Sequence, residues 1–120
     1  MLSKMRRFIY LSGISLLLVS FVYISCKKDQ NCNVSDPIEE LAWLKESIDE
    51  VKHDEYSYFM MAKYKKETVF YYGNCNPAIN YVSYILNCNG EQLGYTNELY
   101  NDLTDIKLIW EHESGRCTFQ

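Results

Sequence analysis

Residues 36–52, DPIEELAWLKESIDEVK, decide the fold class because they predict a helix with one apolar face. Asp36 stands in the N-cap position, with Pro37 at the first helical position and Glu39 three residues after the cap, as in a capping box. Apolar residues then recur three or four positions apart, and charged residues occupy much of the rest. The apolar residues are Ile38, Leu41, Ala42, Leu44, Ile48 and Val51. We therefore expect an amphipathic helix from Pro37 to Lys52 that packs on a second layer.

The residues after this helix have the composition of β-strands. From Tyr56 onward, Tyr, Phe, Val, Ile and Met occur in short runs separated by Asn, Gly and Pro. The runs predict strands at 57–65, 68–73, 81–87, 91–95 and 106–112, with tight turns at 66–67 and 89–90. Residues 96–104 fit either one or two helical turns or a loop. The predicted fold is α+β, with one N-terminal amphipathic helix packed on an antiparallel β meander of about four to five strands, stapled by disulfides.

Five apolar residues are the predicted structural core. Trp43, Leu44 and Ile48 come from the helix, and Val69 and Trp110 come from the strands. A Trp near each end of the domain indicates that the last strand lies against the first helix.

The N-terminal segment has the pattern of an export signal. Lys4, Arg6 and Arg7 precede an apolar run from Phe8 to Ile24, as in a secretory signal peptide. Tyr23-Ile24-Ser25-Cys26 resembles a bacterial lipobox, with Tyr23 in the place usually held by Leu. We expect cleavage before Cys26 and lipidation of its thiol, which would anchor the protein in a membrane. Simple secretion and an uncleaved anchor are the alternatives, since the 17-residue run is close to the shortest spanning helix.

These features divide the chain into a signal peptide at 1–25, a polar tether at 26–35 and a single small α+β domain at 36–120. Without residues 1–25, 95 residues remain, which is enough for one domain. The signal segment holds three of the 12 basic residues and none of the 16 acidic ones, so the remaining net charge is 9 − 16 = −7. This charge argues against a nucleic-acid partner, because phosphates require clustered cations.

Four cysteines follow Cys26, and their even number in a small exported chain indicates disulfides. Their wide spacing does not fit the close pairs that are typical of structural zinc sites. If strands 68–73 and 81–87 form a hairpin, Cys75 and Cys88 lie at opposite ends of it, too far apart to bond. A helix antiparallel to the first strand brings Cys32 towards Cys88. We therefore favour Cys32–Cys88 together with Cys75–Cys117.

Catalytic signatures are missing from the sequence. It contains no Gly-rich phosphate loop, nucleophile elbow or H-E-x-x-H motif. His53 and His112 have acidic neighbours, but both lie at the ends of predicted elements, where charged residues face water. We expect no enzyme, no cofactor and no metal, and keep an enzyme or metal carrier using His53 or His112 as the least favoured alternative.

Tyrosine is abundant, with 11 Tyr beside 5 Phe and 2 Trp. Tyr joins a large apolar face to a polar tip, which suits binding, although strand tyrosines also serve as ordinary packing. The candidates for a binding surface are Tyr58, Tyr71, Tyr84 and Tyr95. We expect a non-enzymatic interaction module for an unknown protein or glycan. The alternative is a small exported inhibitor or immunity-like protein that inserts the loop at 74–80 into its partner.

Several short motifs resemble a known family in their order along the chain. Trp43-Leu44-Lys45 lies in the helix, Val69-Phe70 in a strand, Cys88-Asn89-Gly90 at a turn and Ile109-Trp110 near the end. Over residues 38–111 this order is similar to the small uncharacterised lipoproteins of Bacteroidetes. After the C-x-G turn those proteins often have a glycine-rich segment and further cysteines, where this chain has Leu93-Gly94-Tyr95-Thr96.

The resemblance implies a lipid-anchored domain of the bacterial cell envelope and carries no activity with it. It also implies an outer-membrane location, in which Lys27-Lys28-Asp29 resembles the short charged signals that send some such lipoproteins to the outer surface.

Overall fold

The computed structural model describes residues 32–119, so the predicted signal peptide, Cys26 and the predicted tether up to Asn31 lie outside the described residues. The helical elements are α2 (Pro37–Glu40), α3 (Ala42–Val51), α4 (Thr96–Leu99) and the 3₁₀ turn η1 (Tyr100–Asp102). The strands are β1 (Ser57–Tyr64), β2 (Glu67–Asn74), β3 (Tyr84–Leu86), β4 (Gln92–Tyr95) and β5 (Leu103–Glu111). They form one antiparallel sheet, which confirms the predicted α+β class.

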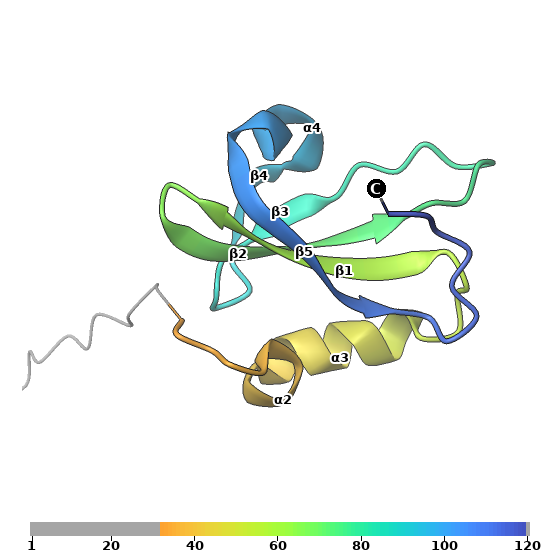
Figure 1. Ribbon diagram of the computed structural model, residues 1–120, viewed down its shortest axis with the longest axis horizontal. Coiled ribbons are helices and arrows are strands. Elements are labelled where there is room, and N and C mark those ends of the chain that lie inside the picture. The colour runs from red at the N-terminus through yellow and green to blue at the C-terminus, as the bar shows by residue number, and fades with distance from the viewer. Residues whose placement is uncertain (1–31, 120) are drawn as a thin grey trace, which may run out of the picture.

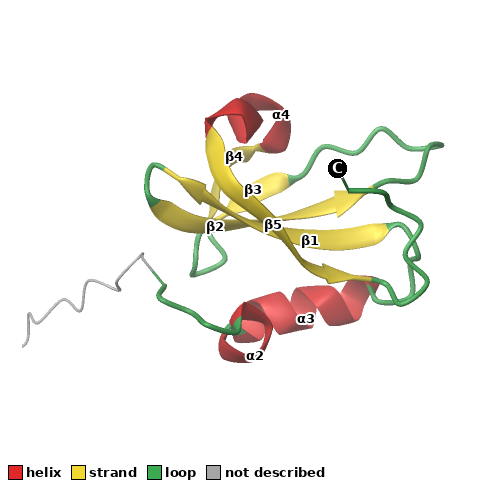
Figure 2. Ribbon diagram, viewed as in Figure 1, coloured by secondary structure: helices red, strands yellow, loops and turns green. Residues whose placement is uncertain are grey.

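The sheet has two differently covered faces. Helices α2 and α3 lie along one face, whereas α4, the loop after β2 and the C-terminal segment lie on the other (Figure 1). The loops at 75–83 and 112–119 have no regular secondary structure (Figure 2). The sheet therefore has a helix-covered face and a second face that only short elements surround.

The predicted helix is interrupted at Leu41, which has extended backbone angles (φ −107°, ψ 99°). Neither Gly nor Pro stands at this position, so local propensity does not explain the break. Leu41 and Ile38 both pack against the core, and the disulfide at Cys32 holds the preceding segment to the far end of the sheet. Tertiary packing thus redirects the chain between α2 and α3.

Asp36 caps α2, as predicted, although the reciprocal carboxylate differs. Asp36 Oδ1 accepts a hydrogen bond from the Glu39 amide at 3.4 Å. The return bond goes from the Asp36 amide to Glu40 Oε2, at 3.2 Å, while Glu39 pairs with Lys45. The capping box predicted with Glu39 is therefore completed by Glu40.

Two tight hairpins build the first four strands into a meander. The β1–β2 turn consists of Lys65 and Lys66, both with positive φ (48° and 68°), one residue earlier than predicted. Two consecutive left-handed residues are typical of a type I′ turn, which matches the twist of a hairpin. In the β3–β4 turn, Gly90 has φ 76°, and Asn87 Oδ1 accepts from the amides of Asn89 and Glu91.

The fifth strand does not extend the meander. The strand order is β4-β3-β2-β1-β5, so the chain crosses the sheet after β4 and β5 pairs with β1 at the opposite edge. β5 also begins at Leu103, before the predicted start at residue 106. A register shift near Asp105, which has φ 51°, disturbs the alternation that the sequence prediction used.

The third strand is shorter than predicted. Residues 81–83 lie outside β3, and only Ile85 and Leu86 pair with β2. The Cys75–Cys117 disulfide draws the chain after β2 towards the C-terminal segment, and Cys75 donates its amide to the Tyr56 carbonyl at 3.0 Å. Residues 76–83 consequently form a loop.

Each face of the sheet has its own apolar cluster. Leu44 and Ile48 join Phe59, Phe70 and Cys88 on the helix side, where Trp43 and Trp110 are partly buried against them. Val69 is fully buried, but it belongs to the second cluster, with Ala62, Tyr71, Ile85 and Leu103 on the other face. The predicted core residues are thus divided between two clusters.

The structure confirms the favoured disulfide pairing. Cys32 bonds Cys88, and Cys75 bonds Cys117. The first joins the segment before α2 to the β3–β4 turn, where Trp43 Nε1 also donates to the Cys88 carbonyl at 2.9 Å. The second joins the loop after β2 to the C-terminal segment.

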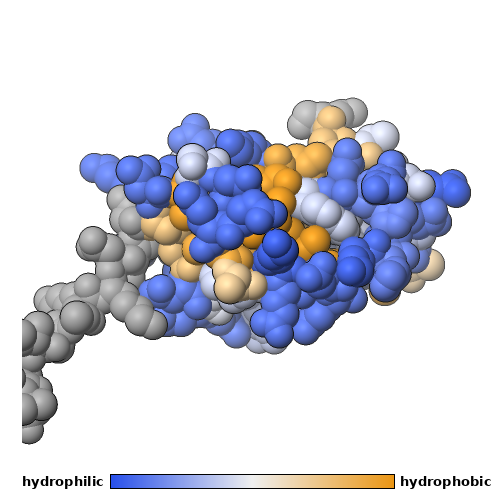
Figure 3. Space-filling model, turned by 90° about the horizontal axis from the view of Figure 1, so that it is seen from below, coloured by the Kyte–Doolittle hydropathy of each residue, from blue (hydrophilic) through white to orange (hydrophobic). Residues whose placement is uncertain are grey.

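Seen from the helix side, the surface is mostly hydrophilic, with a band of hydrophobic side chains visible between the polar ones (Figure 3). Within residues 32–119, no helix has the length and apolar character needed to cross a membrane.

Candidate functional site

A hollow of about 550 Å³ lies on the sheet face opposite α2 and α3. Its floor comes from β1, β2 and β5, and its walls come from the loop after β2, from α4 with η1, and from the C-terminal segment. The floor residues are Tyr58, Met60, Tyr71, Tyr72, Gly73, Asn74, Ile106 and Leu108, and the wall residues are Tyr81, Ser83, Thr96, Tyr100, Thr118 and Phe119. We call this hollow the tyrosine pocket.

Strand alternation explains why aromatic residues reach the floor. Successive side chains of a strand point to opposite faces, so Phe59 and Met61 pack on the helix side while Tyr58 and Met60 point the other way. In the register of β1 with β2, Tyr58 lies opposite Gly73. A Cβ atom at Gly73 would collide with the Tyr58 ring. The glycine therefore provides the space in which that ring lies.

The C-terminal segment forms one wall because three interactions hold it. The Cys75–Cys117 disulfide fixes its end, and Arg116 donates its amide to the Glu55 carbonyl at 3.1 Å. Phe119 packs edge-on against Tyr58, with ring centroids 5.0 Å apart. The disulfide is the only covalent one of these links, so it determines where the wall stands.

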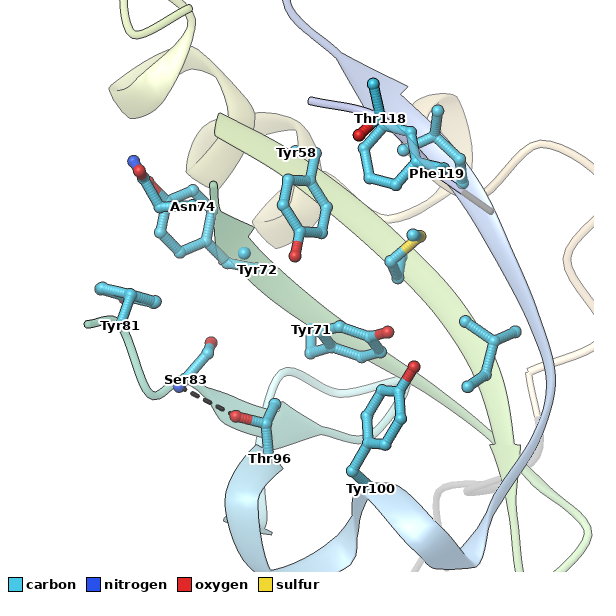
Figure 4. A pocket seen from close by; sticks show the side chains of 14 residues that line it. Tyr58, Tyr71, Tyr72, Asn74, Tyr81, Ser83, Thr96, Tyr100, Thr118 and Phe119 are labelled. Atoms are coloured by element: carbon cyan, nitrogen blue, oxygen red, sulfur yellow. Dashed lines mark hydrogen bonds between the residues drawn. The ribbon is translucent and has the colours of Figure 1, made fainter. Parts of the chain in front are cut away.

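The opposite wall is formed by α4 and η1. The Thr96 amide donates to the Ser83 carbonyl at 2.8 Å, and the Ser83 amide donates to Thr96 Oγ1 at 3.1 Å (Figure 4). Leu99 packs over Gly94, where an added Cβ would stand 2.7 Å from Leu99 Cδ1. This packing leads the chain directly into η1 and brings Tyr100 over the floor.

The hydroxyl groups of Tyr58, Tyr71 and Tyr100 point into the pocket (Figure 4). Within residues 32–119, no protein group accepts from or donates to any of the three. Tyr72 also borders the pocket, but its ring packs against the helix-side cluster, and its hydroxyl bonds Ser57 Oγ at 2.8 Å and accepts from Asn74 Nδ2 at 3.1 Å. The hydroxyls of Tyr58, Tyr71 and Tyr100 are thus free to bond a ligand.

The pocket is electrically neutral. None of its lining residues, within the described chain, is Asp, Glu, Lys, Arg or His. Burial raises the pKa of Tyr71 to about 12 and also raises the pKa of Tyr58 and Tyr81. These phenols therefore keep their protons at physiological pH and remain both donors and acceptors.

The four predicted surface tyrosines do not form one surface. Tyr58 and Tyr71 lie in the pocket, and Tyr71 is only 6% exposed, so it is not the exposed strand residue that was expected. Tyr84 and Tyr95 pair across β3 and β4, with ring centroids 5.0 Å apart and exposures of 46% and 41%. They lie outside the pocket, because the register places them on the opposite face from the Ile85–Gly94 pair.

Sequence reasoning missed Tyr100 and Phe119. Tyr100 lies in residues 96–104, whose helix or loop character was left open. The favoured Cys75–Cys117 pairing was a usable signal for Phe119, since it places the C-terminal segment beside the end of β2. The direction of that segment across the sheet has no marker in the sequence.

The two histidine segments meet in a second hollow of about 320 Å³, lined by Lys52, His53, Trp110, Glu111, His112 and Glu113. No group of three His, Cys, Asp or Glu side chains that could hold a metal occurs in the part of the chain described. His112 Nδ1 accepts from the Ser114 amide at 3.0 Å and so helps to form a turn.

Asp54 is also structural. A hydrogen bond from the Tyr56 amide lowers its pKa, and Asn74 Nδ2 donates to it at 2.7 Å.

Comparison of the chain with protein-family models, with curated proteins and with solved structures finds no match in any of the three. The tyrosine pocket is therefore the main basis for a functional proposal.

Proposed function

We propose that this chain is a lipid-anchored protein of the bacterial cell envelope that works as a non-enzymatic binding module through the tyrosine pocket. The observation that carries the proposal is a hollow of about 550 Å³ into which unpartnered hydroxyls point. Ligand sites commonly have about 300–1,000 Å³ and combine apolar walls with a few polar groups. The pocket has a volume in this range and combines aromatic rings with several hydroxyl groups, and no pair of acid and base that could serve catalysis lies among its described lining residues.

The proposed anchoring is supported by the signal-like segment and by the resemblance to small Bacteroidetes lipoproteins. Lipidation of Cys26 would hold the domain at the outer membrane, with residues 27–35 as the tether and Lys27-Lys28-Asp29 directing it to the outer surface. Mass spectrometry of the mature N-terminus tests this part. An acylated Cys26 at the N-terminus is expected, and an unmodified Cys26 within an intact chain would contradict the anchor.

Binding is tested with full-length protein and envelope extract separated into polysaccharide, peptide and lipid fractions. One fraction should raise the melting temperature of the wild type and of Tyr84→Ala, but not that of Tyr100→Ala. Both substitutions remove a Tyr that is about half exposed, so they form a matched pair that differs in position relative to the pocket. If no fraction distinguishes Tyr100→Ala from the wild type, the pocket is not the binding site.

A second candidate function is that of an exported inhibitor or immunity-like protein. The loop at 75–83 supports it, because Ile79, Tyr81 and Val82 are exposed apolar residues on a segment anchored by the Cys75–Cys117 disulfide. Such a loop could insert into a partner's site. Under this alternative, Ile79→Asp should abolish binding to a protein partner, while Tyr100→Ala should leave it intact.

A further inference from the structure

We propose that the tyrosine pocket binds an uncharged oligosaccharide. This inference rests on the proposed binding function and names the class of ligand. It is drawn from the polar groups that line the pocket, from the direction of its tyrosines and from its lack of charge.

The polar inventory of the pocket indicates a ligand with many hydroxyl groups. The hydroxyls of Tyr58, Tyr71 and Tyr100 point inward without a protein partner, and Ser83 and Thr118 add further hydroxyl groups to the wall. Each of these groups can both donate and accept. A purely apolar ligand would leave them unsatisfied, which is unfavourable in a partly enclosed site. A sugar satisfies them, because its own hydroxyls also donate and accept.

The lack of charged side chains disfavours ionic ligands. A phosphate, sulfate or carboxylate group is normally bound by Arg, Lys or a helix N-terminus, and no basic residue lines the pocket within the described chain. Thr96 begins the four-residue α4 at the pocket wall, but its amide already donates to the Ser83 carbonyl. An ammonium group would need a carboxylate or a cage of aromatic ring faces. Here Tyr71 and Tyr100 direct their hydroxyl ends inward (Figure 4). The pocket thus fits a neutral polar ligand better than a cation.

The aromatic rings provide the apolar surface that a sugar also needs. Tyr58 and Phe119 pack edge-on at one end of the pocket, and Tyr100 stands at the other. Tyr100 is 51% exposed, so its ring is accessible to a ligand. A sugar ring has C–H groups on its faces, which pack against aromatic rings, and hydroxyls on its edge, which bond to tyrosine.

A glycan array tests the ligand class. Full-length protein, in a detergent without a sugar headgroup, is applied to neutral, sialylated and sulfated oligosaccharides, and choline is tested separately by calorimetry. Binding to neutral oligosaccharides and not to the charged probes is expected. Preference for a sialylated or sulfated glycan, or for choline, would overturn the proposal, as would failure of every neutral glycan.

Calorimetry with the best neutral oligosaccharide then tests the position of the site. Tyr100→Phe keeps the ring and removes one hydroxyl, so it should weaken the affinity about 2- to 12-fold. Tyr100→Ala also removes the ring and should weaken it further. Tyr84→Phe removes the hydroxyl of a similarly exposed Tyr outside the pocket and should change the affinity less than about 2-fold. An unchanged affinity in both Tyr100 variants would place the site elsewhere and overturn the proposal.

Two kinds of failure can be told apart. If an extract fraction stabilises the protein in a Tyr100-dependent manner but no neutral glycan binds, the ligand class is wrong and the binding function stands. If no fraction and no glycan gives a Tyr100-dependent signal, both proposals fail. Circular dichroism of each variant verifies that the fold is retained.

Discussion

Removing the Cys75–Cys117 disulfide should both destabilise the domain and open the pocket. The bond joins residues separated by 42 positions. In the chain-entropy description, closing a loop of that length restricts the unfolded state by about 4 kcal/mol at 25 °C. The native C-terminal segment would also gain freedom, which offsets part of this loss. We therefore expect Cys75→Ala with Cys117→Ala to lower the free energy of unfolding by about 2–4 kcal/mol.

Guanidinium unfolding of the oxidised double variant, followed by circular dichroism, measures this change. Hydrogen exchange locates it, because amides in residues 112–119 should exchange faster while those in β1 and β2 stay protected. Cys32→Ala with Cys88→Ala is the matched control, since its separation of 56 positions predicts a similar entropic loss at the other end of the sheet. A loss below about 1 kcal/mol, with residues 112–119 still protected, would refute the argument that this bond determines where the wall stands.

Three further changes test the fold. Replacing Lys65 with Asn and Lys66 with Gly should raise the free energy of unfolding by about 1–2 kcal/mol, because both lysines have positive φ, which Asn and Gly adopt more readily. A lower midpoint of urea unfolding would contradict the type I′ turn. Leu44→Ala should lower the free energy of unfolding by about 2–5 kcal/mol, since Leu44 is fully buried; a loss below about 1 kcal/mol in chemical denaturation would contradict that burial. Trp110→Ala should cost less than the roughly 3–5 kcal/mol of a fully buried Trp, because Trp110 is only partly buried; a larger loss would contradict its place at the edge of the core. Burial raises the pKa of Tyr71 to about 12 in the folded protein, whereas the pKa in the unfolded chain is near 10. The unfolded state therefore loses this proton at a lower pH than the folded state. The free energy of unfolding should accordingly fall as the pH rises from about 10 to 12. Tyr71→Phe should reduce that fall by about 1 kcal/mol between pH 9 and 11, and an unaltered pH dependence in urea unfolding would show that Tyr71 is not buried in this way.

The parts of the fold that follow from local chemistry could be predicted from the sequence. The apolar spacing of residues 38–51 specifies a helix face, and the Asn and Gly at 89–90 specify a turn. The favoured disulfide pairing also rested on local geometry, because a hairpin separates Cys75 from Cys88 by the length of its strands, and a helix antiparallel to the first strand brings Cys32 towards Cys88. Each of these inferences needed only one element or two consecutive ones.

The parts that depend on distant segments could not be predicted in this way. The break at Leu41 has no local marker and arises from packing and from the Cys32–Cys88 bond. The left-handed residue Asp105 shifts the register of β5 and hides its start. The pocket combines three strands with α4, η1 and the C-terminal segment. Its existence follows from the crossing of the chain from β4 to β5, which the composition of those segments does not specify.

The two faces of the sheet give different answers to the question of why the chain has so many tyrosines. Tyr72 borders the pocket but packs against the helix-side cluster, and packing explains it, since its ring contacts Phe59 and its hydroxyl bonds Ser57 and Asn74. In the pocket, the hydroxyls of Tyr58 and Tyr71 have no partner among residues 32–119 and stay accessible to water in the hollow. Packing alone does not use these hydroxyls, because Phe would fill the same volume with its ring. The presence of Tyr at both positions therefore favours a ligand that bonds to them in place of water.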